Sequence, residues 1–328
     1  MRIFDYVCLI LILMGVGFIY RKYMDKYDID SETHEYELIK KYLLNESSIT
    51  KQKKPIIWIH IPYEYNAREW KSFYSRGSTD LNLPYQNLTI RSIIDHNESF
   101  HVCLIDDSSF TNLIPGWTQD INQVGDPIKS KLRQLCLLKL LYIYGGMVVP
   151  SSFLCLQDMS YFYQQSLRGN KPFLVENINR TYTGTNDIQF MPDLSFMGAP
   201  KDNLVIKNMI HFGETIISTD LTEQSIFLGE YSKWALQAYN NKQLNIANGL
   251  QIGVKDKDNK PILADDLLEN KYLKLPTNKS FIGIYIPANE MLSRPSINWF
   301  CYESMDKILS SNTALGKYFV LAQAPCFK

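Results

Sequence analysis

The chain has 328 residues, of which 45% are apolar, enough for one large domain or two ordinary ones with a substantial core. Lysine plus arginine and aspartate plus glutamate number 34 each, and no basic stripe interleaved with aromatic residues is found. Composition and charge therefore argue against a nucleic-acid partner.

An uncharged apolar stretch lies at the start of the sequence. Residues 6–20 carry no charged side chain, and with Ile3 and Phe4 they approach the roughly 20 residues that a helix needs to cross a bilayer. Arg2 could instead belong to a cleaved signal peptide, but the residues after Gly17 form a poor cleavage site. The sequence predicts an uncleaved transmembrane anchor over residues 1–24, followed by a stalk over residues 25–54.

The side of the membrane on which the domain lies is open. Arg21, Lys22 and Lys26 follow the apolar stretch, which by the positive-inside rule favours a cytosolic domain. The six cysteines show no CxxC or Cys/His pairing and look like reduced core residues, which fits the same side. Five Asn-x-Ser/Thr sequons are weak evidence for a lumenal domain, since several arise by chance in such a sequence: Asn45, Asn87, Asn97, Asn179 and Asn278.

The folded domain is predicted to begin at Pro55. Ile56–Ile61 is a continuous apolar run of strand length, typical of a strand buried on both faces of a parallel sheet. Apolar residues at helical spacing over 88–94 and a second buried run, Phe100–Ile105, complete a strand–helix–strand beginning.

A helix is predicted from Asp126 to Tyr144. It starts with an Asp-Pro pair, in which Asp accepts as the N-cap and Pro occupies the first helical position. Gly145 and Gly146 follow as a stop and a close turn that needs positive φ, and Met147–Val149 makes a short strand.

The rest of the sequence continues this alternation without repeats or flexible linkers, so residues 55–328 are predicted to form one domain. Strands are expected at 171–176, 188–191, 250–254 and 282–286, and helices at 203–217 and 225–239. The pattern predicts an α/β fold with a mainly parallel sheet flanked by helices.

The segment 132–152, which contains Tyr-Ile-Tyr-Gly-Gly-Met, resembles a signature of GT-A-fold nucleotide-sugar glycosyltransferases of the DXD or capsular-polysaccharide-synthesis type. There, Ser-Asp-x-x-Arg is followed by a helix ending in Gly-Gly and by a strand Tyr-x-Asp-x-Asp. The resemblance extends over about residues 55–160, including Pro55 and His60, and implies a GT-A-like, Rossmann-type domain.

The residues that carry chemistry in that family are replaced here. Aligned on the two glycines, Gln134 stands for the first aspartate, Leu137 for the arginine, and Pro150 and Ser152 for the two aspartates of DXD. In the family those aspartates hold a divalent metal on the nucleotide diphosphate. The resemblance therefore implies a degenerate site without a metal, in a non-catalytic binding or virion-membrane component.

An active, metal-independent glycosyltransferase of the hexosyltransferase type, using a nucleotide-sugar donor, is the alternative. Lys129, Lys131 and Arg133 are the basic side chains that could replace a cation on a diphosphate, although a solvated first helical turn explains them as well. The stretch 58–66 and Tyr-Ile-Tyr-Gly-Gly-Met are also similar to uncharacterised membrane-anchored, glycosyltransferase-like proteins of large DNA viruses. This similarity implies a single-pass protein of the virion or of host endomembranes.

Eight residues are predicted to contact a nucleotide sugar or glycan, and none to bind a metal: His60, Asp106, Asp107, Gln134, Gly145, Gly146, Ser151 and Ser152. Each has an ordinary alternative, because Asp caps turns after strands, a histidine can be a core residue, and the glycines fit a close turn. Six further carboxylates near predicted strand ends, without a spacing that marks a site, could act as a base or contact a sugar: Glu176, Asp187, Asp193, Asp265, Asp266 and Glu290.

Overall fold

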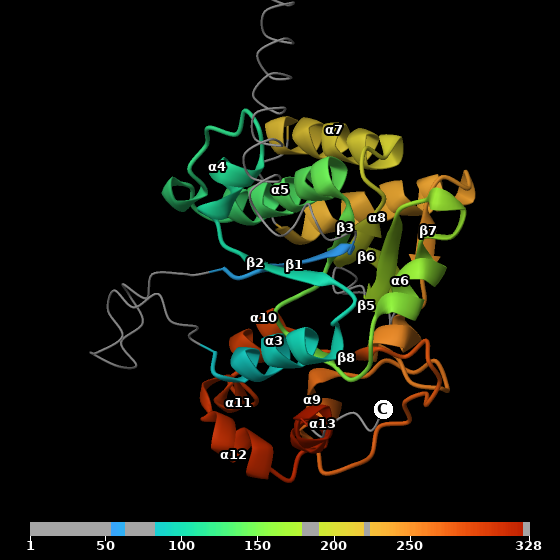
Figure 1. The fold of residues 1–328 in the computed structure, drawn as a ribbon. Helices are drawn as coiled ribbons and strands as arrows, with labels where there is room; N and C mark the ends of the chain where they lie inside the picture. The colour runs from blue at the N-terminus through green and yellow to red at the C-terminus, as the bar shows by residue number, and fades with distance from the viewer. Residues whose placement is uncertain (1–53, 63–82, 179–189, 220–223, 324–328) are drawn as a thin grey trace, which may run out of the picture. The chain divides into compact units, whose positions relative to one another are not determined.

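The computed structural model describes residues 54–62, 83–178, 190–219 and 224–323 (Figure 1). The predicted anchor over residues 1–24 lies outside these ranges, as does the predicted stalk apart from Lys54. None of the helices in the described ranges combines the length and the apolar character that crossing a membrane requires.

The chain divides into two compact units. Of the described residues, 111–119 belong to one unit and the others belong to the larger one. Helix α4 (Ser109–Leu113) runs into the segment 111–119, where Trp117 Nε1 donates to the carbonyl oxygen of Gln119 at 2.8 Å. All strands of the described ranges lie in the larger unit.

A six-stranded sheet in the order β2-β1-β3-β6-β5-β7 forms the centre of the larger unit. Strand β1 pairs in parallel with β2 and β3, and β5 pairs in parallel with β7. Only β6 among these strands runs in the opposite direction, against β3 and β5. The prediction of a mainly parallel sheet is confirmed. The strands are β1 (Ile56–His60), β2 (His101–Ile105), β3 (Gly146–Val148), β5 (Phe173–Ile178), β6 (Phe190–Ala199) and β7 (Asn245–Ala247).

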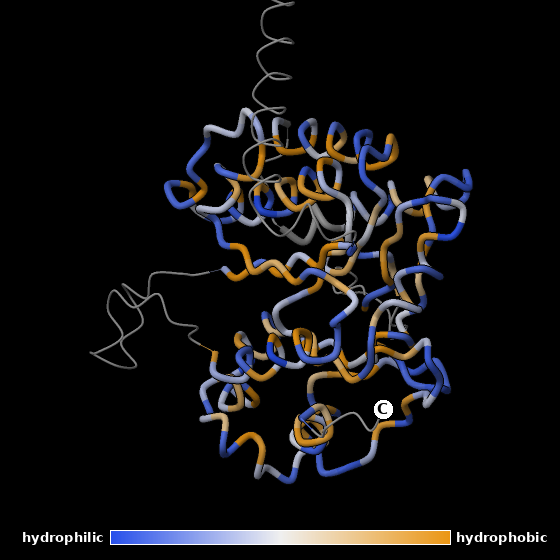
Figure 2. Tube along the Cα trace, viewed as in Figure 1, coloured by the Kyte–Doolittle hydropathy of each residue, from blue (hydrophilic) through white to orange (hydrophobic). Residues whose placement is uncertain are grey.

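The three apolar runs of the first half of the domain lie in this one sheet, as predicted, with ends shifted by one residue. Figure 2 shows apolar colour along nearly all of β1, which has strands on both sides. Strand β2 differs from the prediction of full burial, because it forms the edge of the sheet and leaves Leu104 half exposed.

Helices cover both faces of the sheet (Figure 1). On one face α5 (Ile128–Tyr144) packs against α7 (Leu204–Thr219) and α8 (Gln224–Asn240). On the other, α3 (Tyr85–His96) and α6 (Ser160–Ser166) contribute Ile93 and Phe162 to a core that contains Ile57 and Val175 of the strands. The helix predicted from Asp126 begins two residues later, and Asp126 Oδ1 accepts from the backbone N–H of Ser130 at 3.2 Å.

A second core lies among the C-terminal elements. The antiparallel pair β4 (Phe153–Cys155) and β8 (Gly283–Tyr285) contributes Leu154 and Ile284 to it. The prediction of a strand at 250–254 is wrong, because a 3-10 turn, η4 (Gly249–Ile252), begins where the Asn248 side chain accepts from the N–H of Leu250. The surrounding helices are α9 (Ala264–Leu268), α10 (Ala288–Ser293), α11 (Trp299–Tyr302), α12 (Met305–Ser310) and α13 (Ala314–Gln323), and two further 3-10 turns are η2 (Ile121–Gln123) and η3 (Arg168–Asn170).

The side chain of Asn97 forms hydrogen bonds that connect the end of α3 with β4 and the segment after it. Its buried side-chain amide donates to the carbonyl oxygen of Ile93 at 2.7 Å and to Cys155 Sγ at 3.4 Å. Its Oδ1 accepts from the N–H of Met159 at 2.9 Å. Asn278, by contrast, is exposed in a turn, where its Oδ1 accepts from Ser280 Oγ at 2.7 Å.

Candidate functional site

The carboxyl ends of the parallel strands lie along one edge of the sheet, which is where open α/β sheets bind ligands. His60 is the last residue of β1, Asp106 and Asp107 follow β2, and residues 150–152 follow β3. Sequence-predicted site residues from three strands therefore lie at the same edge.

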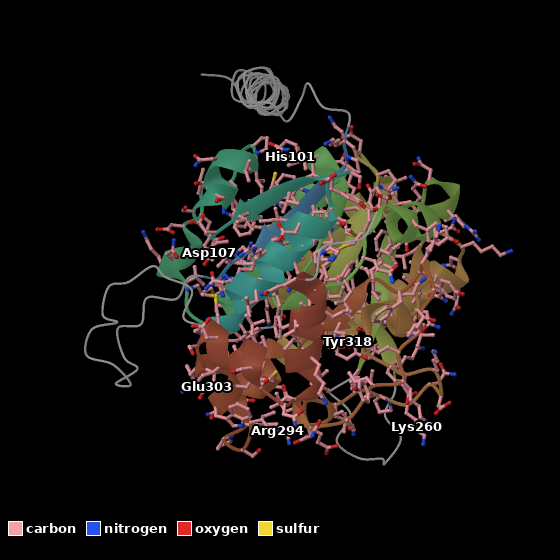
Figure 3. The ribbon with its side chains drawn as sticks, turned by 60° about the horizontal axis from the view of Figure 1, so that its bottom comes forward. His101, Asp107, Lys260, Arg294, Glu303 and Tyr318 are labelled. Atoms are coloured by element: carbon pink, nitrogen blue, oxygen red, sulfur yellow. The ribbon has the colours of Figure 1, made fainter. Side chains whose placement is uncertain are left out.

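Three side chains meet there in a buried cluster. His60 Nε2 lies 2.9 Å from Asp107 Oδ1, while Arg133 of α5 donates through Nε to Oδ1 at 2.9 Å and through Nη2 to Oδ2 at 2.7 Å. The Asp107 side chain is only 4% exposed. Because the guanidinium binds both carboxylate oxygens, this is the bidentate geometry of a strong ion pair. Figure 3 labels Asp107 at this edge.

The partners decide the ionisation of Asp107. Burial by itself would raise the pKa of this carboxyl, but the hydrogen bonds from His60 and Arg133 and the nearby cation hold the pKa well below its usual range. An ionised carboxylate only accepts, so His60 Nε2 is assigned as the donor in this contact. The imidazole also stacks on Phe110, with ring centroids 5.3 Å apart and an interplanar angle of 18°.

Asp106 does not join the cluster. Its Oδ1 accepts from the Ser109 N–H at 2.8 Å, from Ser109 Oγ at 2.6 Å and from Ser108 Oγ at 2.7 Å. These hydrogen bonds outweigh the effect of partial burial and lower the pKa of its carboxyl. Asp106 thus caps the turn after β2, which is the ordinary role of Asp at such a position.

The paired glycines are required by the backbone. Gly145 ends α5 with φ 71° and Gly146 continues into β3 with φ 101°, values that L side chains rarely adopt. A Cβ on Gly146 would lie 2.3 Å from the carbonyl oxygen of Ile56. The carbonyl oxygen of Gly145 also accepts from Trp58 Nε1 at 3.0 Å, so close packing against β1 explains both residues.

At the position of the DXD signature, Ser151 and Ser152 form main-chain hydrogen bonds with neighbouring elements. The carbonyl oxygen of Ser151 accepts from Thr89 Oγ1 of α3 at 2.5 Å, and that of Ser152 accepts from the N–H of Ile286 at 3.3 Å. Both serines are buried. On α5, Gln134 Oε1 is a buried acceptor that has no hydrogen-bond partner among the described residues.

The basic residues at the start of α5 do not form a solvated face. Lys131 and Arg133 are buried, whereas Lys129 is partly exposed. Arg133 is paired with Asp107, which sequence reasoning missed because nothing in the spacing of these residues links the end of β2 to α5. The three cations therefore do not act as one group at the sheet edge.

Most of the additional carboxylates have structural partners. Asp265 and Glu290 both bind Arg294 among the C-terminal helices, Asp266 caps α9 through the N–H of Leu263, and Asp193 accepts from the N–H of Ser195. Asp187 lies outside the described residues. Glu176 also has a partner, the buried Lys255, but unlike the others it lies at the carboxyl edge of the sheet, on β5. Sequence reasoning did not identify Lys255.

Over the described ranges, no group of three or more histidine, cysteine, aspartate or glutamate side chains is arranged to hold a metal ion. The acids at the β1–β3 end of the sheet edge are already engaged, Asp107 by Arg133 and Asp106 by its own turn. At this end the His60 side chain is 10% exposed, and the carbonyl oxygens of residues 150–152 accept hydrogen bonds from Phe153, Thr89 and Ile286.

No family model matches the chain, and no curated protein matches it. The solved structures that match the chain at low similarity include the following two. The apo-form glycosyltransferase GlyE of Streptococcus pneumoniae TIGR4 has a TM-score of 0.33 and 9% identity, over 61% of this chain and 46% of that chain. The 4-diphosphocytidyl-2C-methyl-D-erythritol synthase of Anaerococcus prevotii DSM 20548 has a TM-score of 0.29 and 10% identity, over 64% of this chain and 93% of that chain. The match thus spans less than half of GlyE, and similarity at this level carries no information about the site.

Proposed function

We propose that this chain is a membrane-anchored, glycosyltransferase-like protein that binds a nucleotide sugar or a glycan at the carboxyl edge of its sheet, without a divalent metal and without catalysing transfer. The resemblance over residues 132–152 and a mainly parallel sheet with only β6 reversed support a GT-A-like fold. The anchor over residues 1–24 belongs to the same proposal, with a location in a virion or an endomembrane.

One observation carries the non-catalytic part of the proposal. At the β1–β3 end of the sheet edge, every described carboxylate is occupied by protein donors, and Pro150 and Ser152 stand where metal-binding carboxylates would be expected. A divalent cation on a diphosphate needs anionic oxygen ligands from the protein. In metal-dependent transferases, this cation stabilises the charge that develops on the leaving nucleotide.

A metal-independent transferase is the second candidate, and it rests on the position of Arg133 and His60 at this edge. A guanidinium can replace a cation on a diphosphate when its charge is available. Here Asp107 accepts from the guanidinium at 2.7 and 2.9 Å and neutralises it. The binding role is therefore better supported than the catalytic one.

The proposal predicts metal-independent binding. Isothermal calorimetry with a panel of nucleotide diphosphate sugars should give the same affinity with Mn²⁺, with Mg²⁺ and with chelator, and no nucleoside diphosphate should be released on long incubation. Binding that tightens tenfold or more with metal, or steady donor turnover, would return the chain to the ordinary transferases.

A matched pair of histidine variants locates the binding edge. His60→Gln removes the imidazole next to Asp107 and should weaken nucleotide binding, whereas His211→Gln changes an exposed residue of α7 and should leave it unchanged. The double change Pro150→Asp with Ser152→Asp should not create metal-dependent activity, because Gln134 and Leu137 still lack the partner groups. Equal affinity in the His60 and His211 variants would place the ligand elsewhere.

A further inference from the structure

The second charged group of the sheet edge lies on β5. Trp58 of β1, Val148 of β3, Met197 of β6 and Leu174 of β5 are at one level, linked pair by pair through the sheet register. His60 and Glu176 each lie two residues further along their strands. The pairing of β5 with β6 shifts register between Leu174 and Val175, so Glu176 is placed by its strand: β5 lies three strand steps, roughly 14 Å, across the sheet from β1.

Glu176 is held by one of its two carboxylate oxygens. Its Oε2 accepts from Lys255 Nζ at 2.7 Å and from the N–H of Gly249 at 3.1 Å. Its Oε1 accepts no hydrogen bond within the described structure, and the side chain is 25% exposed. Asp107 differs in this respect, because protein donors occupy both of its oxygens.

Lys255 fixes the orientation of this carboxylate. Its side chain is 9% exposed, and its Nζ lies 4.8 Å from the centre of the Phe190 ring at the start of β6. A buried ammonium between a carboxylate and an aromatic face has little freedom to move. Lys255 and Gly249 therefore fix the orientation of the Glu176 carboxylate through Oε2, while Oε1 accepts no hydrogen bond from the described residues.

The charges limit the chemistry of a ligand at this point. An anion would meet the carboxylate oxygen, and a cation would lie close to the ammonium of Lys255, so like charges disfavour both. A neutral group that donates hydrogen bonds fits, because a carboxylate is a strong acceptor for hydroxyl donors. Sugars carry several such hydroxyls.

We infer that Glu176, oriented by Lys255 and Gly249, is a sugar-binding residue that accepts a hydrogen bond from a hydroxyl group of the bound saccharide. This inference rests on the proposed function, in which the nucleotide lies at the His60 end of the same edge. The separation of the two groups assigns the nucleotide to β1–β3 and the sugar to β5–β7.

The test compares ligands with and without the sugar. Glu176→Gln keeps the shape of the side chain but removes the anionic acceptor, so affinity for a nucleotide sugar should fall about tenfold or more, while affinity for the matching free nucleoside diphosphate stays within twofold. Glu290→Gln is the matched control, since that carboxylate also pairs with a basic side chain but lies with Arg294 among the C-terminal helices (Figure 3). Thermal melts should show that both variants are folded.

A second variant covers the case in which Glu176→Gln does not fold. Glu176→Asp retains the charge beside Lys255 but withdraws the oxygen by one methylene, and should also weaken the sugar ligand alone. Unchanged sugar affinity in either folded variant, or an equal loss for nucleotide and nucleotide sugar, overturns the inference.

Binding of free methyl glycosides, which carry no nucleotide, tests this inference independently of the proposed function. Glycoside binding that depends on Glu176, together with no nucleotide binding, supports the sugar site and overturns the nucleotide part of the proposed function. If the folded wild-type chain binds neither nucleotide sugars nor glycosides, both are wrong.

Discussion

The Asp107 carboxylate shows how one residue sets both the stability and the pH response of the sheet edge. Its pKa in the folded chain lies below the value of about 3.9 expected for an unfolded chain, because His60 and Arg133 outweigh the effect of burial. A carboxyl with a lowered folded pKa stabilises the fold fully above its unfolded pKa. That contribution is lost as the pH falls further toward the folded value.

Replacing this carboxylate is therefore expected to be costly. Asp107→Asn removes the buried carboxylate that binds the Arg133 guanidinium through both oxygens, which should lower the free energy of unfolding at pH 7 by about 3–5 kcal/mol. The variant should also lose less stability than wild type as the pH falls below 4. Denaturant unfolding curves over a pH series measure both effects.

Asp95→Asn is the control for this experiment, because Asp95 pairs with Arg91 on the exposed side of α3 and such pairs contribute little. If Asp107→Asn is as stable as the wild type, or loses as much stability as the wild type below pH 4, the His60–Asp107–Arg133 cluster does not stabilise the fold.

At the scale of the elements, the turn from α5 into β3 determines where the sheet edge lies. Gly145 and Gly146 allow the chain to turn from α5 into β3 beside β1, which places residues 150–152 next to the end of β1. The turn therefore influences the site through geometry, without any contact between a glycine and a ligand.

Gly146→Ala should destabilise the fold by about 3 kcal/mol or more, since positive φ adds to a clash with the main chain of Ile56. Gly229→Ala, in the helix α8 with open space around it, should instead stabilise by about 0.5–1 kcal/mol. Thermal unfolding of both variants tests the pair, and similar melting temperatures would contradict this account of the turn.

The regular elements could be predicted because periodicity and buried runs are local signals. The strand predicted over Ile56–Ile61 and the helix predicted from Asp126 to Tyr144 are confirmed, with small errors at their ends. The region 250–254 was predicted as a strand, yet the Asn248 cap and the positive φ of Gly253 favour a turn there. Long-range pairs left no local signal. Asp107 and Arg133 are 26 residues apart, and Glu176 and Lys255 are 79 residues apart.

For the whole molecule, the attachment to membranes remains a prediction about residues 1–24. Because residues 1–24 contain an uncharged apolar stretch close to the length that a bilayer requires, their deletion should release the protein into the soluble fraction. Sedimentation of the full-length and truncated chains after a high-salt wash measures this. A truncated chain that still pellets would place the attachment in another segment.

Because Asn97 is hydrogen-bonded inside the fold, glycosylation at Asn97 and Asn278 can show which side of a membrane the domain faces. A glycan is attached at Asn Nδ2, and Nδ2 of Asn97 donates to the carbonyl oxygen of Ile93 and to Cys155 Sγ. A chain glycosylated at Asn97 could not form these contacts at the end of α3. Asn278 projects from an exposed turn and leaves room for the sugar. A folded domain that matures in the secretory lumen should therefore carry a glycan at Asn278 and none at Asn97. A domain facing the cytosol should carry neither.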